Sequence, residues 1–128
     1  MPQQRVELEK LGVVLCYLHG SVANGTARED SDVDIAVLFK QEPSDPIEAT
    51  GALLQALEGY MPGREKDVAL LNEASPLFKQ IVASTGKLLY ARSPDDALRF
   101  ELRAMHEYED SRYIAHIGRE IAKARAGV

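Results

Sequence analysis

Apolar and polar residues are arranged along this chain in blocks that predict strands and helices in alternation. Short apolar runs within residues 13–18, 32–39, 64–71 and 88–91 have the length and composition of β-strands. Apolar residues recur at helical spacing within residues 3–11, 47–60, 76–83 and 94–126, which predicts helices, and a short helix or turn is expected after the first strand. This order predicts an α/β (α+β) fold, with a mixed four-stranded sheet and helices on one or both of its faces.

Capping and turn residues separate these elements. Ser44 or Asp45 is expected to cap the helix over residues 47–60, with Pro46 in its first turn. The fourth strand follows Gly86 and is expected at an edge of the sheet. There, Lys87 is more simply explained as a surface residue than as a phosphate ligand.

The last predicted helix is longer than the packing of one small domain needs. Ser93 is its expected N-cap, and a helix over residues 94–126 would be roughly 48 Å long at 1.5 Å per residue. Its apolar stripe consists of Leu98, Leu102, Met105, Tyr113, Ile117 and Ile121. The distal half is expected either to dock a partner or to extend into solvent as a frayed tail. His106 and His116 have no metal-ligand spacing and are predicted to be surface residues.

The composition is that of one globular domain over residues 1–128. Apolar residues make up 45% of the chain and charged residues 27%, and the net charge of −5 argues against strong direct binding to nucleic acid or an anionic membrane. Cys16, the only cysteine, lies in the first apolar run and is predicted to be buried. No signal peptide and no window with the roughly 18 apolar residues of a membrane span are found, so we expect a cytoplasmic protein.

The candidate chemistry lies between the first two predicted strands. The first strand leads into Gly20-Ser21, where glycine allows backbone to approach a ligand and a helix beginning there would present free N–H groups to a phosphate. Asp32 and Asp34 open the second strand, and their i, i+2 spacing places both carboxylates on one face. Two close carboxylates repel each other unless a cation lies between them. Hard oxygen ligands favour Mg²⁺, which takes its remaining ligands from water and substrate phosphates.

Each half of this pattern is common on its own, because a Gly-Ser pair is usually a turn and an Asp-x-Asp pair is usually a cap or a solvated strand end. The combined spacing Gly-Ser-x10-Asp-x-Asp arises by chance in roughly one chain of this length in several hundred. It resembles the signature of the nucleotidyltransferase superfamily of the DNA polymerase beta type. Residues 5–110 resemble the minimal nucleotidyltransferase (MNT) family, whose members act as antitoxins beside HEPN-domain toxins. His19 and Asn24 differ from frequent family choices, although neither is a signature position.

The resemblance implies the nucleotidyltransferase fold and a Mg²⁺-dependent transfer of AMP from ATP to a tyrosine hydroxyl of a cognate HEPN ribonuclease toxin. It assigns Gly20 and Ser21 to the triphosphate and Asp32 and Asp34 to Mg²⁺. It also aligns Asp67 with the third carboxylate of the family's site. Asp67 alone would be an ordinary solvated strand residue, but in the family's position it would be a further metal ligand or the base for the acceptor hydroxyl.

Two other functions stay open at this point. A binding module could neutralise a partner by steric occlusion, although such a module would not need three clustered acids. Transfer to a small molecule such as an aminoglycoside would need walls for a second pocket, which one compact domain does not offer unless it dimerises. No residue outside the phosphate and metal motif identifies the base of the nucleotide.

Overall fold

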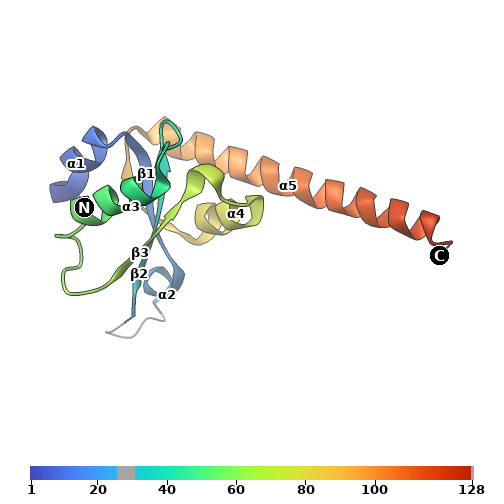
Figure 1. Cartoon of the computed structure of the whole chain (residues 1–128), viewed down its shortest axis with the longest axis horizontal. Coiled ribbons are helices and arrows are strands. Elements are labelled where there is room, and N and C mark those ends of the chain that lie inside the picture. Colours follow the sequence, from blue (N-terminus) through green and yellow to red (C-terminus); the bar gives the residue numbers. More distant parts are fainter. Residues whose placement is uncertain (26–30, 128) are drawn as a thin grey trace.

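The computed structural model describes residues 1–25 and 31–127, and a four-stranded sheet forms its centre (Figure 1). The strands are β1 (Val13–His19), β2 (Val33–Phe39), β3 (Lys66–Leu70) and β4 (Lys87–Ala91). The helices are α1 (Arg5–Lys10), α2 (Gly20–Asn24), α3 (Pro46–Ala56), α4 (Pro76–Thr85) and α5 (Pro94–Arg125), with short 3-10 helices η1 (Pro2–Gln4) and η2 (Leu71–Glu73).

The sheet is mixed, as the sequence predicts. Its strands lie in the order β3-β2-β1-β4. β1 pairs antiparallel with β2 and with β4, whereas β2 and β3 are parallel and are connected through α3. The prediction that the fourth strand lies at an edge is therefore confirmed.

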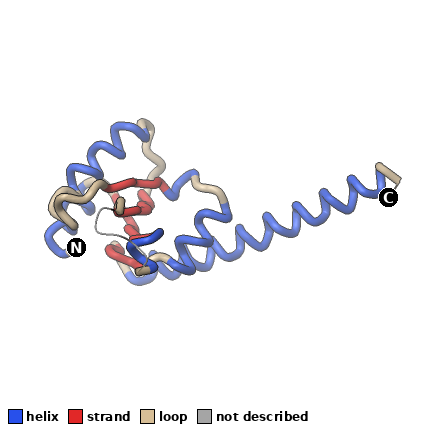
Figure 2. Tube along the Cα trace, turned by 90° about the horizontal axis from the view of Figure 1, so that it is seen from below, coloured by secondary structure: helices blue, strands red, loops and turns tan. Residues whose placement is uncertain are grey.

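Helices cover both faces of the sheet, and this explains the continuous apolar run of β1, which is buried from Val13 to Leu18. On one face, α1 and α3 pack on strand residues in a core that includes Leu8, Val13, Cys16, Ile35, Leu53 and Leu57. On the other face, α4 and α5 pack in a second core that includes Leu15, Tyr17, Ala36, Leu71, Val82 and Phe100. Figure 2 shows the strands between these two groups of helices.

The helix α3 begins as predicted but ends earlier. Asp45, and not Ser44, is its N-cap, and the Asp45 carboxylate accepts hydrogen bonds from the N–H groups of Ile47 and Glu48 at 3.1 and 3.2 Å. The predicted helix over residues 47–60 ends four residues sooner, and its last part forms a turn around Gly59, a residue that disfavours helix.

The third strand begins at Lys66, two residues later than predicted, whereas the other strands agree with their predicted ranges within one residue.

The long C-terminal helix is confirmed, because α5 continues to Arg125 and extends well past the sheet (Figure 1). Its first half packs against α4 and the sheet. All residues over 109–127 are exposed. None of the helices in the described part of the chain combines the length and apolar character that a bilayer-crossing segment needs.

Candidate functional site

The predicted Gly-Ser pair lies where β1 ends and α2 begins. Gly20 has a φ of +73°, in the left-handed region that glycine adopts at little cost. A Cβ atom at this position would collide with Oδ2 of Asp34 and lie 3.2 Å from its Cγ. The Gly20 backbone is therefore packed directly against the Asp34 carboxylate. The backbone of Ser21 continues α2, but its side chain lies outside the described part of the structure.

Asp34 is the middle residue of a polar row that crosses three strands. In the register of the sheet it is paired with His19 of β1 and with Asp67 of β3. Paired residues on neighbouring strands share a face of the sheet. This is the face covered by α4 and α5, because the alternate residues Tyr17 and Ala36 belong to that core. The structure thus brings the predicted Asp34 and Asp67 side by side, next to Gly20.

The third predicted acid, Asp32, directly precedes β2, and the alternation of the chain places it on the same side as Asp34. Asp32 and Asp67 are exposed, and Asp34 is half-buried. Within residues 1–25 and 31–127, no three acidic, histidine or cysteine side chains gather closely enough to enclose a metal ion. The assignment of all three aspartates to one metal site therefore stays a prediction.

The donor set nevertheless fits one kind of ion. Mg²⁺ is commonly bound through one or two carboxylates, with waters and substrate phosphates as its other ligands, so it does not need a complete protein cage. Asp34 and Asp67 supply carboxylates at paired strand positions, and Asp32 is two residues away from Asp34. Because Gly20 has no side chain, its backbone lies directly against the Asp34 carboxylate, so a ligand of the acids would also meet this backbone.

Arg64, which the sequence analysis did not single out, fixes the start of β2. Its guanidinium donates two hydrogen bonds to the carbonyl oxygen of Ser31, at 2.7 and 3.1 Å. The N–H of Val33 also donates to the carbonyl of Glu65 at 2.8 Å. These bonds hold the residues on both sides of Asp32 beside β3. The sequence signal for this role is weak, since Arg64 is one of several charged residues before the third strand.

His19 lies at the same end of the sheet. Its ring meets Phe78 of α4 edge-on, with centroids 5.4 Å apart and an interplanar angle of 89°. Burial lowers the pKa of the imidazole, and the carboxylates of Asp34 and Asp67 oppose that shift. Within the part of the chain that the structure describes, its buried Nε2 has no hydrogen-bond partner. In the sequence, His19 stands out only as a departure from a frequent family choice, because its pairing with Asp34 depends on strand order.

Two clefts lie at the opposite end of the sheet from Asp34. One of about 750 Å³ lies beside the loop after β2, and one of about 460 Å³ lies between the sheet and α5. The exposed Asp32 and Asp67 are instead reached directly from solvent. As far as residues 1–25 and 31–127 are concerned, the acidic end of the sheet is therefore open to a large acceptor.

Other residues that the sequence analysis considered are placed as expected. Cys16 is fully buried, and burial raises the pKa of its thiol to about 12. Lys87 is exposed and is paired with Leu18, whose side chain belongs to the core on the other face from the acids. His106 and His116 are exposed.

Residues 6–95 match the protein family described as "Polymerase beta, Nucleotidyltransferase". This range contains all the predicted site residues, from Gly20 to Asp67. A relative from Shewanella oneidensis, the protein adenylyltransferase MntA, is 36% identical over 95 residues, which make up 74% of this chain and 66% of that protein. The chain thus spans slightly less than two thirds of this relative's length.

Solved structures agree with the predicted fold. A chain from the crystal structure of a toxin-antitoxin with AMP-PNP aligns with a TM-score of 0.66 and 28% identity, covering 92% of this chain and 97% of that one. A chain from the complex of a tri-AMPylated Shewanella oneidensis HEPN toxin with an MNT antitoxin aligns with a TM-score of 0.60 and 26% identity, covering 93% and 95%. These likenesses confirm the resemblance identified from the Gly-Ser-x10-Asp-x-Asp spacing.

Proposed function

Because this chain belongs to the polymerase beta nucleotidyltransferase family, we propose that it transfers AMP from ATP to a tyrosine hydroxyl of a cognate HEPN toxin and so acts as an antitoxin. The observation that carries the proposal is the packing of the Gly20 backbone against Asp34, with Asp67 paired beside it. Backbone N–H groups at a helix start next to acidic groups can bind an anionic triphosphate together with a cation, and nucleotidyl transfer needs both.

The relatives support adenylylation as the reaction and a HEPN toxin as the acceptor protein. MntA is named a protein adenylyltransferase, and the HEPN toxin in complex with the MNT antitoxin is tri-AMPylated. The AMP-PNP in the other toxin-antitoxin structure is an analogue of ATP. We carry these properties over to this chain as part of the proposal.

In the proposed reaction, the acceptor oxygen forms a bond to the α-phosphorus of ATP while the bond from that phosphorus to the pyrophosphate oxygen breaks. The proton of the hydroxyl passes to the carboxylate of Asp67, and pyrophosphate leaves with the pair of electrons of the broken bond. Gly20 and Ser21 hold the β- and γ-phosphates. General-base catalysis of this kind contributes roughly 10²- to 10⁴-fold.

We also propose that the reaction requires Mg²⁺, held by Asp32 and Asp34 with Asp67 as a further ligand. When bound, the ion neutralises negative charge on the triphosphate and on the carboxylates. Arg64 has a positioning role, because its hydrogen bonds to Ser31 hold the segment next to Asp32. We propose that the reaction takes place in the cytoplasm, where ATP and Mg²⁺ are abundant.

The open acidic end favours a protein acceptor over a small molecule. Asp32 and Asp67 are exposed, and they line neither the two clefts at the other end of the sheet nor the one of about 340 Å³ beside Arg64. A small acceptor such as an aminoglycoside would need enclosing walls at the acids. A tyrosine on the surface of another protein can reach an open site directly.

We propose that α5 docks the toxin. Large apolar side chains on this helix are between 40% and 69% exposed, namely Leu98, Leu102, Met105, Tyr113, Ile114, Ile117 and Ile121. So many exposed apolar residues on one element mark an interaction surface. The same observation supports steric occlusion as a second candidate function, because docking alone could block the toxin.

The test is intact-mass spectrometry of the cognate toxin after incubation with this chain, ATP and Mg²⁺. We expect the toxin mass to increase by one or more AMP units, and Asp34→Asn to slow the transfer at least about 100-fold. The matched control is Asp95→Asn, an exposed aspartate at the start of α5, which should leave the rate unchanged. An unchanged rate in Asp34→Asn would show that the site assignment is wrong.

The same mixture in EDTA separates the two candidate functions. Adenylylation predicts that the toxin stays active and its mass stays unchanged when Mg²⁺ is removed. Complete neutralisation of the toxin in EDTA without any mass change would instead establish steric occlusion.

A further inference from the structure

A second part of the molecule concentrates positive charge at the end of the sheet away from Asp34. The cleft of about 460 Å³ between the sheet and α5 has both cationic and acidic residues in its lining. The cations are Lys40, Lys79, Arg92, Arg99 and Arg103, and the acids are Asp96 and Glu107. The whole chain has a net charge of −5, so this local excess of positive charge is opposite to the overall charge. We call these seven residues and the space between them the basic cleft.

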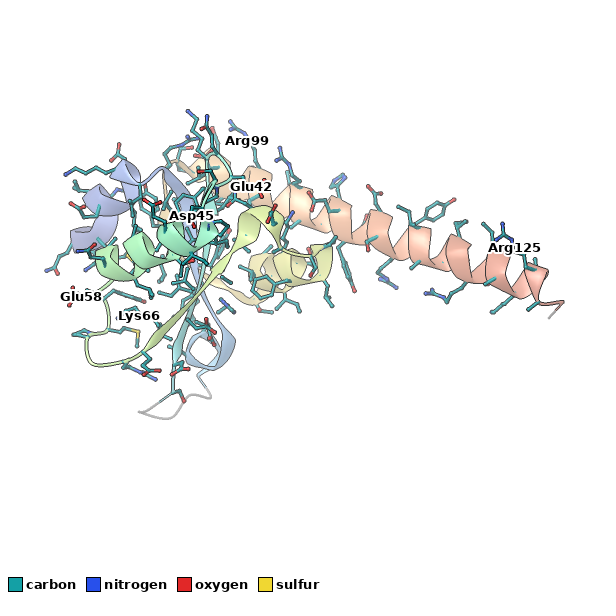
Figure 3. The ribbon with its side chains drawn as sticks, in the orientation of Figure 1. Glu42, Asp45, Glu58, Lys66, Arg99 and Arg125 are labelled. Atoms are coloured by element: carbon teal, nitrogen blue, oxygen red, sulfur yellow. The ribbon has the colours of Figure 1, made fainter. Side chains whose placement is uncertain are left out.

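Several elements contribute to the basic cleft. Lys40 follows β2, Lys79 lies on α4, and the arginines lie at the start of α5 or just before it. Arg99 and Arg103 are four residues apart and so lie on the same side of α5. Figure 3 shows Arg99 at the domain end of this helix, far from Arg125 at its tip.

The two acids of the basic cleft are already paired. Asp96 accepts two hydrogen bonds from the guanidinium of Arg92, both at 3.0 Å, and one from the Ser93 hydroxyl at 3.0 Å. Glu107 forms an ion pair with Lys79 at 3.0 Å. Neither acid therefore has to be balanced by the remaining cations.

The remaining cations are available to a ligand. Among the residues that the structure describes, no ion pair or hydrogen bond engages the charged groups of Lys40 and Arg103. Arg99 approaches Asp96 only to 3.6 Å, and its side chain is 69% exposed. The floor between these groups is apolar and includes Val14 and Leu38.

We propose that the basic cleft binds a small anion that carries several phosphate groups, at a site separate from the catalytic acids. Its volume is within the range of about 300–1,000 Å³ that is usual for small-molecule sites. The planar guanidinium groups of Arg99 and Arg103 match the geometry of phosphate oxygens. An inorganic polyphosphate and a nucleoside triphosphate share this chemistry, and the apolar floor would contact the nucleoside of the second.

The test is an NMR titration of the full chain with inorganic triphosphate and, separately, with ATP, both without divalent cations. Backbone amide signals around Lys40 and Arg103 should shift in a saturable manner, and they should still do so in Asp34→Asn, in which the catalytic site is altered. Equal affinity for both probes identifies the phosphate chain as the ligand, and tighter binding of ATP identifies a nucleotide.

The variant Arg99→Glu with Arg103→Glu should weaken this binding at least about tenfold, since charge-assisted contacts to phosphate are lost. The control is Arg112→Glu with Arg119→Glu, which makes the same charge change on the exposed part of the same helix. Lys40→Gln with Arg103→Gln leaves the pairs of Asp96 intact and should also weaken binding, which guards against a folding defect. The proposal would be overturned if the amide signals around Lys40 and Arg103 showed no saturable shift. It would also be overturned if Arg112→Glu with Arg119→Glu weakened binding as much as Arg99→Glu with Arg103→Glu.

Discussion

Asp34 of β2 and Asp67 of β3 occupy paired positions in the sheet, and each is the second residue of its strand. Parallel strands begin at the same edge of a sheet, so both carboxylates lie at that edge. β1 is antiparallel to β2 and therefore ends there, which brings Gly20 against Asp34. The topology thus assembles one site from segments that are far apart in the sequence.

The contact between Gly20 and Asp34 predicts that Gly20→Ala impairs both stability and transfer. An alanine in the left-handed region costs roughly 1–2 kcal/mol, and its Cβ would also force the Asp34 carboxylate to move. Urea unfolding should therefore show a free energy of unfolding that is lower by roughly 1–2 kcal/mol. The transfer rate should fall by at least about tenfold, because the Asp34 carboxylate is displaced.

The control for this prediction is Gly12→Ala. Gly12 has a φ of +83°, but nothing lies within 4 Å of the Cβ that the alanine would add. The variant Gly12→Ala should lose about as much free energy of unfolding as Gly20→Ala, but it should keep the wild-type transfer rate. If both variants lost transfer equally, the close packing at Asp34 would not be the cause.

Asp67→Asn should change how the chain responds to Mg²⁺. Without the ion, this substitution removes one of two like charges at paired strand positions, so the free energy of unfolding should rise by about a few tenths of a kcal/mol at low salt. Added Mg²⁺ should stabilise the wild type more than the variant, because it binds the folded carboxylates. Urea unfolding with and without Mg²⁺ measures both effects, and equal stabilisation of the two proteins would argue against Asp67 as a ligand.

Much of the fold could be predicted because its signals are local. The apolar run of β1 is continuous because both faces of the sheet are covered, and Ser93 and Pro94 mark the start of α5. The early end of α3 was missed because the apolar spacing continues to Tyr60 although Gly59 disfavours the helix.

The site could be predicted only in part, because only some of its residues are close together in the sequence. Gly20, Asp32 and Asp34 lie within one short segment, where spacing in the sequence reports spacing in the structure. Asp67 was identified through family resemblance, because the pairing of β2 with β3 is not visible in the sequence. His19 and Arg64 could not be found from spacing, because their positions beside the acids result from tertiary pairing.

The ion pair of Asp96 predicts a pH dependence of stability. Hydrogen bonds from Arg92 lower the pKa of this buried carboxyl below its ordinary value of 3.8. The unfolded chain therefore holds the proton more tightly, so the pair stabilises the fold above the ordinary pKa and is lost as the pH falls through the lowered one. Asp96→Asn should be less stable than the wild type at neutral pH, and the difference should shrink in acid.

Urea unfolding over a pH series measures this difference. Introducing Asp96→Asn into an Arg92→Gln background should cost much less than in the wild type, because the pair is already broken. A difference between wild type and Asp96→Asn that stays constant down to acid pH would contradict the role of the pair.

Cys16 should be unreactive in the folded protein. The residue is fully buried, and burial raises the pKa of its thiol to about 12, whereas the thiolate is the form that attacks disulfide reagents. An aromatic disulfide reagent should modify the native chain at least about 100-fold more slowly than the unfolded chain. Fast modification under native conditions would contradict the burial of β1 on both faces.

The final prediction concerns the exposed apolar side of α5, where we propose that the toxin docks. Ile117 and Ile121 are 40% and 48% exposed, so the double variant Ile117→Asp with Ile121→Asp should leave the free energy of unfolding nearly unchanged. If these side chains are buried against the toxin, the affinity of the complex should fall by roughly tenfold or more for each, as measured by calorimetry. The matched control is Ala115→Asp with Ala122→Asp, which puts the same charges on another side of the same turns. Equal weakening by both pairs would point to charge repulsion along the helix, and normal affinity in the isoleucine double variant would place the toxin elsewhere on the chain.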